Sequence, residues 1–575
     1  MIKNMAIPND TIKLIRKYAV KNAIDYGKAK AANVLGKVAS GTPKEQLGEL
    51  RAEIDRTVDE VNSLSKEELL KEYKPYEGEF EEQHERRVES SSKPRMVLDG
   101  AVNGSFVTRF PPEPTGYMTI GHAKAAFLVS EFAKIYDGKL LLYFDDSNPE
   151  KERQEYVDAF KKDLEWLGIK FGREYYASDS IEKMYDYTRK LIGSGNAYAC
   201  GCSADEMKLK RFDGAECGHR DAPAKESSEK FEAMLSGKYG EGEMVIRFRG
   251  EMGSQNTALR DPTIMRIKKD KHYRQGDKYT TWPTYDLNTP INDSLNGVTD
   301  VLRDKNYELR NPLYNMVLDA LGLRKPRIHS DARLSIKGQP KQKREVRKLI
   351  ADHLVEGYDD PRLVTITALR RRGIQPEAIR RFVLSFGMSK MDSVVGMDLL
   401  LAENKKIVDP TAKRLYYVPA PVDISIRDFS ARKVELKLHP TADLGKREYT
   451  VDNRFYISGE DVATLREGDV IKLKELVGIK LEMVDDSWVG EPSDADTAKR
   501  FQWVCDGNYL NCSILVPGDP LDENGNFRKD SLRTNNGYIE SYAGELKERE
   551  IVQLERFGFC ILDSKKEMRF IFISK

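Results

Sequence analysis

Two charged residues of opposite sign follow buried-type strands. Arg109 lies in the short apolar run 106–110, and Asp145 directly follows the run 139–144. The segment between them, 120–136, has the apolar spacing of a helix, so the pattern predicts a parallel βαβ unit. The carboxyl ends of parallel strands meet at one sheet edge, where α/β proteins bind ligands. A cation and an anion at that edge suit a zwitterion such as an amino acid.

The turn after the first strand has the features of a phosphate-binding site. Its sequence, Pro111-Pro112-Glu113-Pro114, excludes both helix and regular strand pairing. The helix that follows begins near Gly121-His122, where a glycine, free N–H groups and an imidazole could receive a phosphate. A Walker A motif and a usable GxGxxG motif are both absent from the sequence, which argues against P-loop and dinucleotide folds. On spacing alone, an ordinary βαβ unit with a proline-rich turn is the alternative.

Four potential metal ligands form two short pairs. Cys200 and Cys202 are followed, after fourteen further residues, by Cys217 and His219. Two such pairs can close a tetrahedral Cys₃His site for zinc, and with all four ligands supplied by protein its role would be structural. The alternative is a set of free cysteines.

Composition places the chain among intracellular multidomain proteins. It has 575 residues, of which 40% are hydrophobic and 33% charged, and a formal net charge of +1. Bulk charge therefore gives no argument for nucleic acid, but the basic stretch 324–350 and the triplet Arg370-Arg371-Arg372 suit phosphate binding, or else a solvated helix face. Six cysteines, no signal peptide and no apolar run of membrane-spanning length predict a cytoplasmic protein.

Changes in pattern along the chain predict the domain organisation. Residues 1–92 have helical spacing and end in a Glu-rich linker, and short β-rich runs dominate after 420. Strand-like alternation after the insertion resumes at 284–287 and 298–302. The predicted parts are a helical N-terminal domain with its linker (1–92), an α/β catalytic domain (99–184 and 284–335), an inserted domain (185–283), a loop and helical domain (336–415), and two β-barrels (420–575).

Long motifs identify a family that the chain resembles. The stretches TRFPPEPTGYMTIGHAKAAF (108–127), LLYFDDSNPEKERQEYVDAFKKDLEWLGI (141–169), DNRFYISGED (452–461) and IVQLERFGFCILD (551–563) resemble glutamyl-tRNA synthetases of the archaeal/eukaryotic type. Glutaminyl-tRNA synthetases are the nearest relatives of that group. The resemblance extends from about 95 to 575. It implies a multidomain α/β plus all-β protein: a class I Rossmann-like core, an inserted acceptor-binding domain with zinc, a helical domain contacting the tRNA stem, and β-barrels binding the anticodon. The N-terminal helices resemble the domain appended to the archaeal enzymes.

The resemblance also implies the reaction and its residues. Glutamate would attack the α-phosphate of ATP, with Mg²⁺, to give glutamyl-AMP and pyrophosphate, and the tRNA ribose would then accept the glutamyl group. The implied glutamate contacts are Arg109, Asp145, Tyr285 and Arg303. The implied ATP contacts are Pro111, Gly121, His122, Arg333, Leu334 and Lys343, with Thr119, His122 and Lys343 acting on the phosphates. The implied tRNA contacts are Glu113, Arg370, Arg371 and Arg372, and the implied zinc ligands are Cys200, Cys202, Cys217 and His219.

Two signatures depart from the family pattern. The usual HIGH motif has Thr119 in place of its first His, and the loop 337–344 has Gln342 where Ser is expected, although Lys343 is retained. The segment 387–390, which superficially resembles the KMSKS motif, is interpreted as a decoy in a helical region. Arg303 distinguishes a glutamyl-tRNA synthetase from a glutaminyl-tRNA synthetase, because the latter typically carries Cys at the matching position.

The sequence therefore leaves three candidate functions. The leading one is a glutamate–tRNA ligase, expected to act as a monomer on tRNA(Glu). The alternatives are a glutamine–tRNA ligase and a non-catalytic tRNA-binding paralogue. Whether tRNA(Gln) is also charged is left open by the sequence, and such misacylation would require a tRNA-dependent amidotransferase as a partner.

Overall fold

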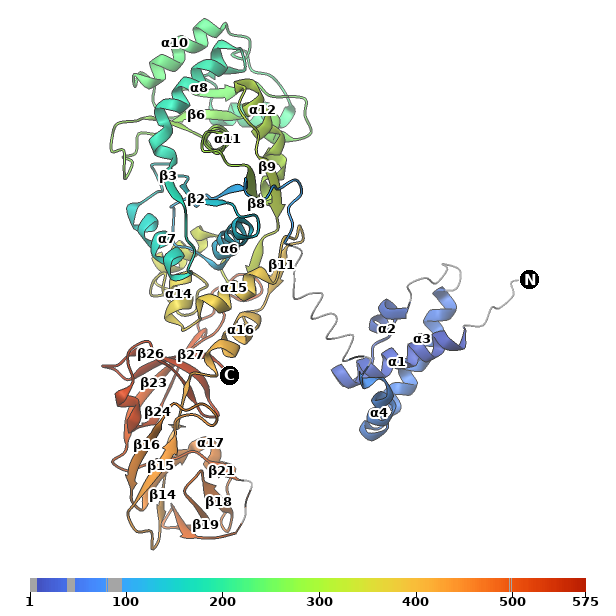
Figure 1. Ribbon diagram of the computed structural model, residues 1–575, viewed down its shortest axis with the longest axis vertical. Coiled ribbons are helices and arrows are strands. Elements are labelled where there is room, and N and C mark those ends of the chain that lie inside the picture. Colours follow the sequence, from blue (N-terminus) through green and yellow to red (C-terminus); the bar gives the residue numbers. More distant parts are fainter. Residues whose placement is uncertain (1–7, 39–46, 79, 81–95, 496, 498) are drawn as a thin grey trace, which may run out of the picture. The chain divides into compact units, whose positions relative to one another are not determined.

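The computed structural model describes residues 8–38, 47–78, 80, 96–495, 497 and 499–575, and the chain divides into two compact units, 1–94 and 95–575. The first unit is helical (Figure 1), as predicted. Ile15 and Ala19 of its first helix pack with Val58 and Val61 of its third in one buried core. The predicted linker lies mostly outside the described residues. The helices are α1 (Asn9–Tyr26), α2 (Ala31–Val38), α3 (Leu47–Ser63) and α4 (Lys66–Tyr73), followed by the 3₁₀ turn η2 (Lys74–Tyr76).

A parallel sheet organises the second unit. Strands β1 (Val107–Phe110), β2 (Lys139–Phe144) and β3 (Arg173–Tyr176) pair in that order, and β8 (Asp300–Asp304) pairs with β9 (Arg327–Asp331). The N–H of Thr299, just before β8, donates to Val107 O at 2.8 Å, so β8 lies beside β1. The resulting strand order is β3-β2-β1-β8-β9. The chain adds β2 and β3 on one side of β1 and later adds β8 and β9 on the other side. Doubly wound sheets bind ligands at the point where the order switches in this way, here between β1 and β8.

Helices cover this sheet, and one of them begins in a segment that was expected to form a strand. The predicted helix after β1 is α6 (Ile120–Ile135), and α7 (Gln154–Trp166) follows β2. Residues 284–287, expected to form a strand, instead begin helix α11, because Leu287 and Ile291 recur at helical spacing and are both fully buried. The other helices are α11 (Tyr285–Leu295) and α12 (Asn311–Leu321), with the 3₁₀ turn η5 (Lys305–Arg310).

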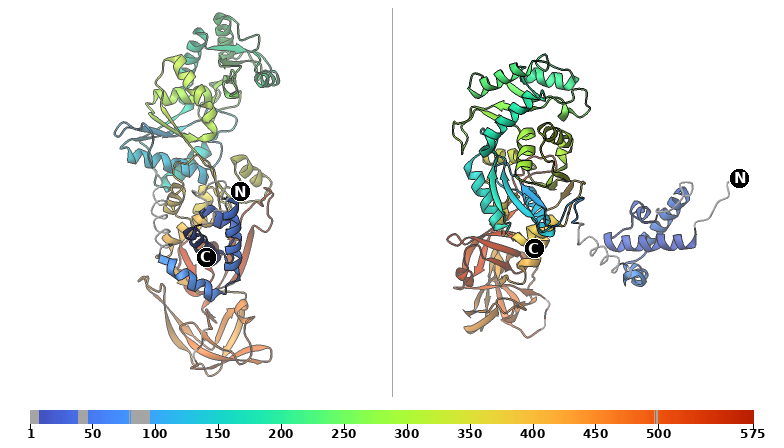
Figure 2. Two further views of the ribbon diagram at one scale, coloured as in Figure 1. Left: turned by 90° about the vertical axis from the view of Figure 1, so that its right-hand side faces the viewer. Right: turned by 45° about the horizontal axis from the view of Figure 1, so that its top comes forward.

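The segment between β3 and α11 forms a subdomain with its own core. It contains an antiparallel sheet of order β4-β5-β6-β7, and Phe231, Ile246 and Trp282 are buried within it. It occupies one end of the unit, seen at the top of Figure 1 and brought forward in Figure 2. Its elements are η3 (Ala177–Ser180), α8 (Ile181–Gly193), β4 (Ala197–Cys200), α9 (Ala204–Asp213), α10 (Ala224–Leu235), β5 (Val245–Phe248), η4 (Thr257–Leu259), β6 (Thr263–Ile267) and β7 (Thr281–Pro283).

Short helices follow the parallel sheet, and the KMSKS-like segment lies among them. Residues 387–390 form a loop rather than helix, because the preceding helix has ended and the Ala332 N–H donates to the Ser389 carbonyl. This loop leads into β11, which pairs with β10 in parallel. The elements are β10 (Leu334–Ile336), α13 (Lys343–Ala351), α14 (Ile366–Arg371), α15 (Pro376–Leu384), β11 (Ser393–Val395) and α16 (Asp398–Val408).

The C-terminal part consists of β-structure, as predicted, in two seven-stranded barrel-like sheets. Their orders are β12-β25-β26-β27-β23-β24-β13 and β21-β18-β19-β20-β14-β17-β22, with a separate hairpin β15-β16. The first sheet therefore joins the strands at 413–419 to strands more than a hundred residues later. No helix among the described ranges has the length and apolarity needed to cross a bilayer. The strands are β12 (Lys413–Leu415), β13 (Tyr417–Pro419), β14 (Pro421–Ile426), β15 (Arg432–Lys437), β16 (Lys446–Val451), β17 (Arg454–Ser458), β18 (Val470–Leu473), β19 (Val477–Val484), β20 (Ser487–Pro492), β21 (Arg500–Phe501), β22 (Val504–Cys505), β23 (Tyr509–Pro517), β24 (Leu532–Glu540), β25 (Ile551–Leu554), β26 (Gly558–Ser564) and β27 (Arg569–Ser574), with the short helices α17 (Gly459–Val462) and η6 (Ser541–Glu545).

Candidate active site

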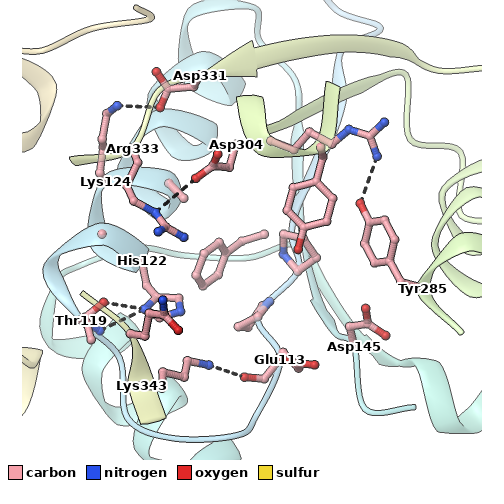
Figure 3. A pocket seen from close by; sticks show the side chains of 18 of the residues that line it. Glu113, Thr119, His122, Lys124, Asp145, Tyr285, Asp304, Asp331, Arg333 and Lys343 are labelled. Carbon is pink, nitrogen blue, oxygen red and sulfur yellow. Dashed lines mark hydrogen bonds and ion pairs between the residues drawn. The ribbon is translucent and has the colours of Figure 1, made fainter. Parts of the chain in front are cut away.

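A cavity of about 1130 Å³ lies at the carboxyl ends of β1, β2 and β8. Its walls come from the parallel sheet, the inserted subdomain and the loop before α13 (Figure 3). The structure brings all the residues predicted to meet glutamate or ATP, and Glu113 with them, to this one cavity. They are Arg109, Pro111, Glu113, Thr119, Gly121, His122, Asp145, Tyr285, Arg303, Arg333, Leu334 and Lys343.

His122 is held as a neutral hydrogen-bond donor. Thr119 is the N-cap residue of α6; its N–H donates to His122 Nδ1 at 3.1 Å, and its hydroxyl lies 2.8 Å from the same nitrogen (Figure 3). Because Nδ1 accepts, the neutral ring carries its proton on Nε2. Burial, with the charges of Lys343 and Arg333, lowers the pKa of His122 well below its usual range. The ring can therefore donate from Nε2 to a phosphate oxygen.

Replacing Thr119 with the His of the usual motif is expected to be tolerated. The backbone N–H of residue 119 would still fix the His122 ring, and only the cap hydroxyl is lost, which typically costs about 0.5–2 kcal/mol. We expect ATP–pyrophosphate exchange to fall by less than about tenfold for Thr119→His. His122→Ala, measured in parallel, should lose much more, and equal losses in the two variants would contradict the donor role given to His122.

Lys343 begins α13 and points toward the proline-rich turn. Its Nζ donates to the Glu113 carbonyl at 2.8 Å and to the Thr115 hydroxyl at 3.3 Å. Burial lowers the pKa of Lys343 to about 8. These two contacts are to uncharged oxygens, which phosphate oxygens of a ligand could replace with a gain in electrostatic attraction.

Asp145 is a partly buried carboxylate that directly follows β2. Its Oδ1 accepts from Asn288 Nδ2 at 2.9 Å and from Ser147 Oγ at 3.2 Å. Burial raises the pKa of Asp145 to about 7, and the charge of Glu113 contributes. An ammonium ion would stabilise the ionised form of this group. Asn288 was not anticipated; it lies three residues after Tyr285 on α11, and that helical spacing was the available signal.

Arg303 presents a buried positive charge to the cavity. It is 9% exposed; its Nη1 donates to the Tyr285 hydroxyl at 3.0 Å, and its Nη2 donates to the Asn311 side chain. In the part of the chain that the structure describes, no carboxylate forms an ion pair with Arg303, and its buried Nε lacks a hydrogen-bond acceptor. Burying an unpaired charge is costly, so this guanidinium is complementary to a ligand carboxylate.

Arg109 differs, because its charge is neutralised inside the protein. Its Nε and Nη2 donate to Asp293 at 2.8 and 3.1 Å, and its Nη1 donates to the Leu302 carbonyl at 3.2 Å. The residue is 1% exposed. These contacts tie β1 to α11 and β8. A contact of Arg109 with the substrate carboxylates stays a prediction.

Lys124, on the side of the cavity predicted to bind the nucleotide, was not predicted from the sequence. Lys124 of α6 is buried; its Nζ lies 2.7 Å from the Asp331 carboxylate and donates to the Ala332 carbonyl at 2.7 Å (Figure 3). It therefore fixes the segment that leads to Arg333 and Leu334. Arg333 lies 3.7 Å from Asp304, and a Cβ on Gly121 would meet no protein atom closer than 3.8 Å. The available signal for Lys124 was a lysine within an apolar stretch of α6, two residues after His122.

The predicted metal ligands come together in the inserted subdomain. The ligand atoms of Cys200, Cys202, Cys217 and His219 all lie within 4.8 Å of one another. The Cys200 and Cys217 sulfurs are 3.8 Å apart, and Cys202 Sγ is 3.5 Å from His219 Nδ1. Tetrahedral zinc with bonds of about 2.3 Å to sulfur and 2.0 Å to nitrogen requires S–S and S–N separations of about 3.8 and 3.5 Å. Zinc therefore fits this set.

A buried arginine lies beside the predicted zinc ligands. Arg247 Nη1 lies 4.0 Å from Cys200 Sγ and 3.6 Å from Cys217 Sγ. A zinc ion with three thiolates and one imidazole has a net charge of −1, and the guanidinium offsets it. Across the described residues, no other group of three or more potential ligands has metal-binding geometry.

We expect the protein to contain about one zinc per chain, and Cys217→Ser to reduce that content to near zero. Hydrogen-exchange protection should fall in the subdomain 197–267. It should persist in β1, β2 and α6, because the predicted zinc ligands lie outside the parallel sheet and its helices. Elemental analysis and hydrogen exchange measure the two effects. Cys512→Ser, at a buried cysteine far from the cluster in sequence, is the matched control and should keep its zinc. Absence of zinc after metal-replete purification would contradict the assignment.

Comparison with known proteins identifies the family. The model of the catalytic domain of class I tRNA synthetases (E and Q) matches residues 105–409, and models of their anti-codon binding domain match 412–496 and 501–563. This chain belongs to that family. It is 40% identical to the glutamate–tRNA ligase of Nitrosopumilus maritimus, over 97% of this chain and 98% of the relative. The glutamate–tRNA ligases of Cenarchaeum symbiosum and Pyrococcus furiosus are each 36% identical over 96% of this chain and 97% of theirs.

In this class I synthetase, the arginine triplet lies away from the catalytic cavity. Arg371 forms a two-bond ion pair with Asp563 at 3.0 and 3.1 Å, and the Nη2 of Arg372, itself buried, donates to the Ile573 carbonyl at 3.1 Å. Arg370 lies over the Trp166 ring. The contacts of Arg371 and Arg372 join the helical region to the C-terminal sheet, whereas Arg370 contacts α7. The predicted contact of the triplet with tRNA stays a prediction.

Proposed function

We propose that the protein is a glutamate–tRNA ligase that uses ATP. The observation that carries the proposal is that one cavity holds both Arg303, which is buried and has no ion-pair partner among the described residues, and the partly buried carboxylate of Asp145. Asp145 would hold the substrate ammonium, and Arg303 with Tyr285 would hold the γ-carboxylate. The full-length similarity to glutamate–tRNA ligases supports the same choice. No observation favours the glutamine–tRNA ligase alternative or a non-catalytic role.

The proposed chemistry has two transfers. A carboxylate oxygen of glutamate attacks the α-phosphorus of ATP, and pyrophosphate leaves. A ribose hydroxyl of the tRNA 3′ end then attacks the acyl carbon, and AMP leaves. The Nε2–H of His122 and the ammonium of Lys343 would stabilise the phosphate charge, which is the main requirement of such a step. Mg²⁺ would arrive bound to the ATP phosphates, as is usual for this ion.

Aminoacylation tests the proposal. Purified tRNA(Glu) and tRNA(Gln) are each offered with glutamate and with glutamine, and all four products are measured. Charging of tRNA(Glu) with glutamate alone supports a discriminating enzyme. Additional charging of tRNA(Gln) with glutamate supports a non-discriminating enzyme, whose product an amidotransferase would have to convert. Preference for glutamine, or no charging at all, would contradict the proposal.

Glutamate affinity is expected to weaken at low pH. Because the pKa of Asp145 is raised to about 7, the ionised form that binds ammonium is lost as pH falls through that value. The KM for glutamate should be flat above about pH 7 and should approach a tenfold rise per pH unit below it. Pyrophosphate exchange with tRNA present, over a range of pH, measures this. Asp145→Asn should raise KM and remove this pH dependence; an unchanged profile would exclude Asp145 as the ammonium partner.

A further inference from the structure

The guanidinium of Arg303 is held by groups that carry no charge. Its side-chain acceptors are the Tyr285 hydroxyl and the amide of Asn311, the first residue of α12. A guanidinium only donates, so this amide must present its oxygen to Nη2. The centroids of the Tyr314 and Tyr307 rings lie 5.0 and 6.0 Å from the guanidinium carbon, and both rings attract the cation without neutralising it. These contacts orient Arg303 and leave its charge uncompensated.

The carboxylates near this arginine are each paired with another cation. One belongs to the residue that follows Arg303 in the sequence, one follows Tyr285, and one accepts a hydrogen bond from the Tyr314 hydroxyl. The ion pairs that they form are Asp304 with Arg333, Asp286 with Arg310, and Asp293 with Arg109. The cavity therefore keeps one positive charge without a protein partner, at the place proposed for the substrate γ-carboxylate.

Position 311 is where a protein charge would change this balance most directly. The side-chain oxygen of Asn311 already accepts from the guanidinium, so a carboxylate in its place would form an ion pair with Arg303. Aspartate has nearly the shape of asparagine, and a negative charge is favourable in the first turn of a helix, so α12 should tolerate it. The described residues that line the cavity include Arg303 but not Asn311, so position 311 acts on a ligand through Arg303.

We propose that Asn311 is a specificity-determining residue of the amino-acid site: its neutral amide orients Arg303 and leaves the guanidinium charge available to a substrate carboxylate. This inference rests on the proposed function and adds the residue that keeps the site selective for an anionic side chain. Bound glutamine would leave the guanidinium buried without a partner, whereas bound glutamate supplies one. The charge at position 311 thus sets how strongly the site prefers glutamate over glutamine.

The test measures pyrophosphate exchange with tRNA present, for glutamate and for glutamine separately. Asn311→Asp should lower kcat/KM for glutamate by roughly ten- to thousandfold, because the new carboxylate neutralises Arg303 and repels the substrate γ-carboxylate. The same variant should keep or raise kcat/KM for glutamine, so the preference narrows by about tenfold or more. Asn306→Asp adds the same charge at an exposed position three residues after Arg303. It is the matched control and should keep both values near those of the wild type.

A second substitution separates orientation from charge. Asn311→Ala removes the hydrogen bond and adds no charge, so kcat/KM for glutamate should fall by less than about tenfold while glutamine stays rejected. In an Arg303→Cys background, Asn311→Ala should add no further loss, because Asn311 acts through Arg303. If Asn311→Asp folds poorly, which a lowered unfolding temperature would show, this double variant decides the question.

Three results would overturn the inference: an unchanged preference in Asn311→Asp, an equal narrowing in Asn306→Asp, or additive losses in the double variant. A fall by the same factor for both amino acids in Asn311→Asp leaves the preference unchanged and would indicate a structural role only. Failure of the wild-type protein to activate glutamate in preference to glutamine would instead contradict the proposed function, and it is recognised before any variant is compared.

Discussion

Arg303→Cys is expected to lose glutamate activation by roughly thirty-fold to several-thousand-fold in kcat/KM. Glutamate differs from glutamine in the charge of its side-chain carboxylate, and a buried carboxylate needs a partner. Arg303 is buried, lacks an ion-pair partner among the described residues, and offers a planar fork that suits a carboxylate. Loss of one partner from a desolvated charge pair costs about 2–5 kcal/mol, which gives this range.

The same change should narrow the preference for glutamate over glutamine. In the wild-type protein, bound glutamine would leave the guanidinium unpaired, whereas cysteine at 303 removes that penalty. Pyrophosphate exchange with each amino acid, with tRNA present, measures both effects. Arg303→Lys is the matched control: it keeps the charge without the fork and should fall between wild type and Cys. Wild-type kcat/KM for glutamate with full rejection of glutamine in Arg303→Cys would move the γ-carboxylate to Arg109 and Tyr285.

The local parts of this site could be predicted from the sequence because short-range patterns determine them. Strand β2 has the predicted bounds, 139–144, since a run of five apolar residues after Lys139 is flanked by a Gly and two Asp. The four predicted zinc ligands form two pairs with one residue between the members of each pair. A single reversal of the chain between the pairs is therefore enough to bring all four together. The misassigned run 284–287 was too short to distinguish a strand from the first turn of a helix.

The partners of those residues could not be predicted, because they come from distant segments. Arg109 is paired with Asp293, 184 residues away, and Arg371 with Asp563, 192 residues away. Nothing in the spacing near Arg109 or Arg303 shows that the first is neutralised and the second is not. That difference depends on which strands the fold places side by side, and it decides which arginine is free to meet a substrate.

Lys343→Ala is expected to slow glutamyl-AMP formation and to leave tRNA affinity nearly unchanged. The ammonium is held at the cavity by two uncharged oxygens and can move to the phosphates as charge develops during transfer. Removing one such electrostatic group costs about 2–4 kcal/mol of transition-state stabilisation, which is roughly thirty-fold to a thousandfold in rate. Pyrophosphate exchange with tRNA present measures the loss, and tRNA binding is measured separately.

The pH dependence separates a charge effect from a loss of packing. Because burial lowers the pKa of Lys343 to about 8, exchange in the wild-type protein should decline as pH rises through that value and the ammonium loses its proton. Arg at this position stays protonated, so Lys343→Arg should keep part of the activity and lose the decline. Lys341→Ala, in the same loop and exposed, is the matched control and should have a small effect. Unchanged exchange in Lys343→Ala, with a large loss in Lys341→Ala, would transfer the role to Lys341, because the loop would then present that side chain to the phosphates.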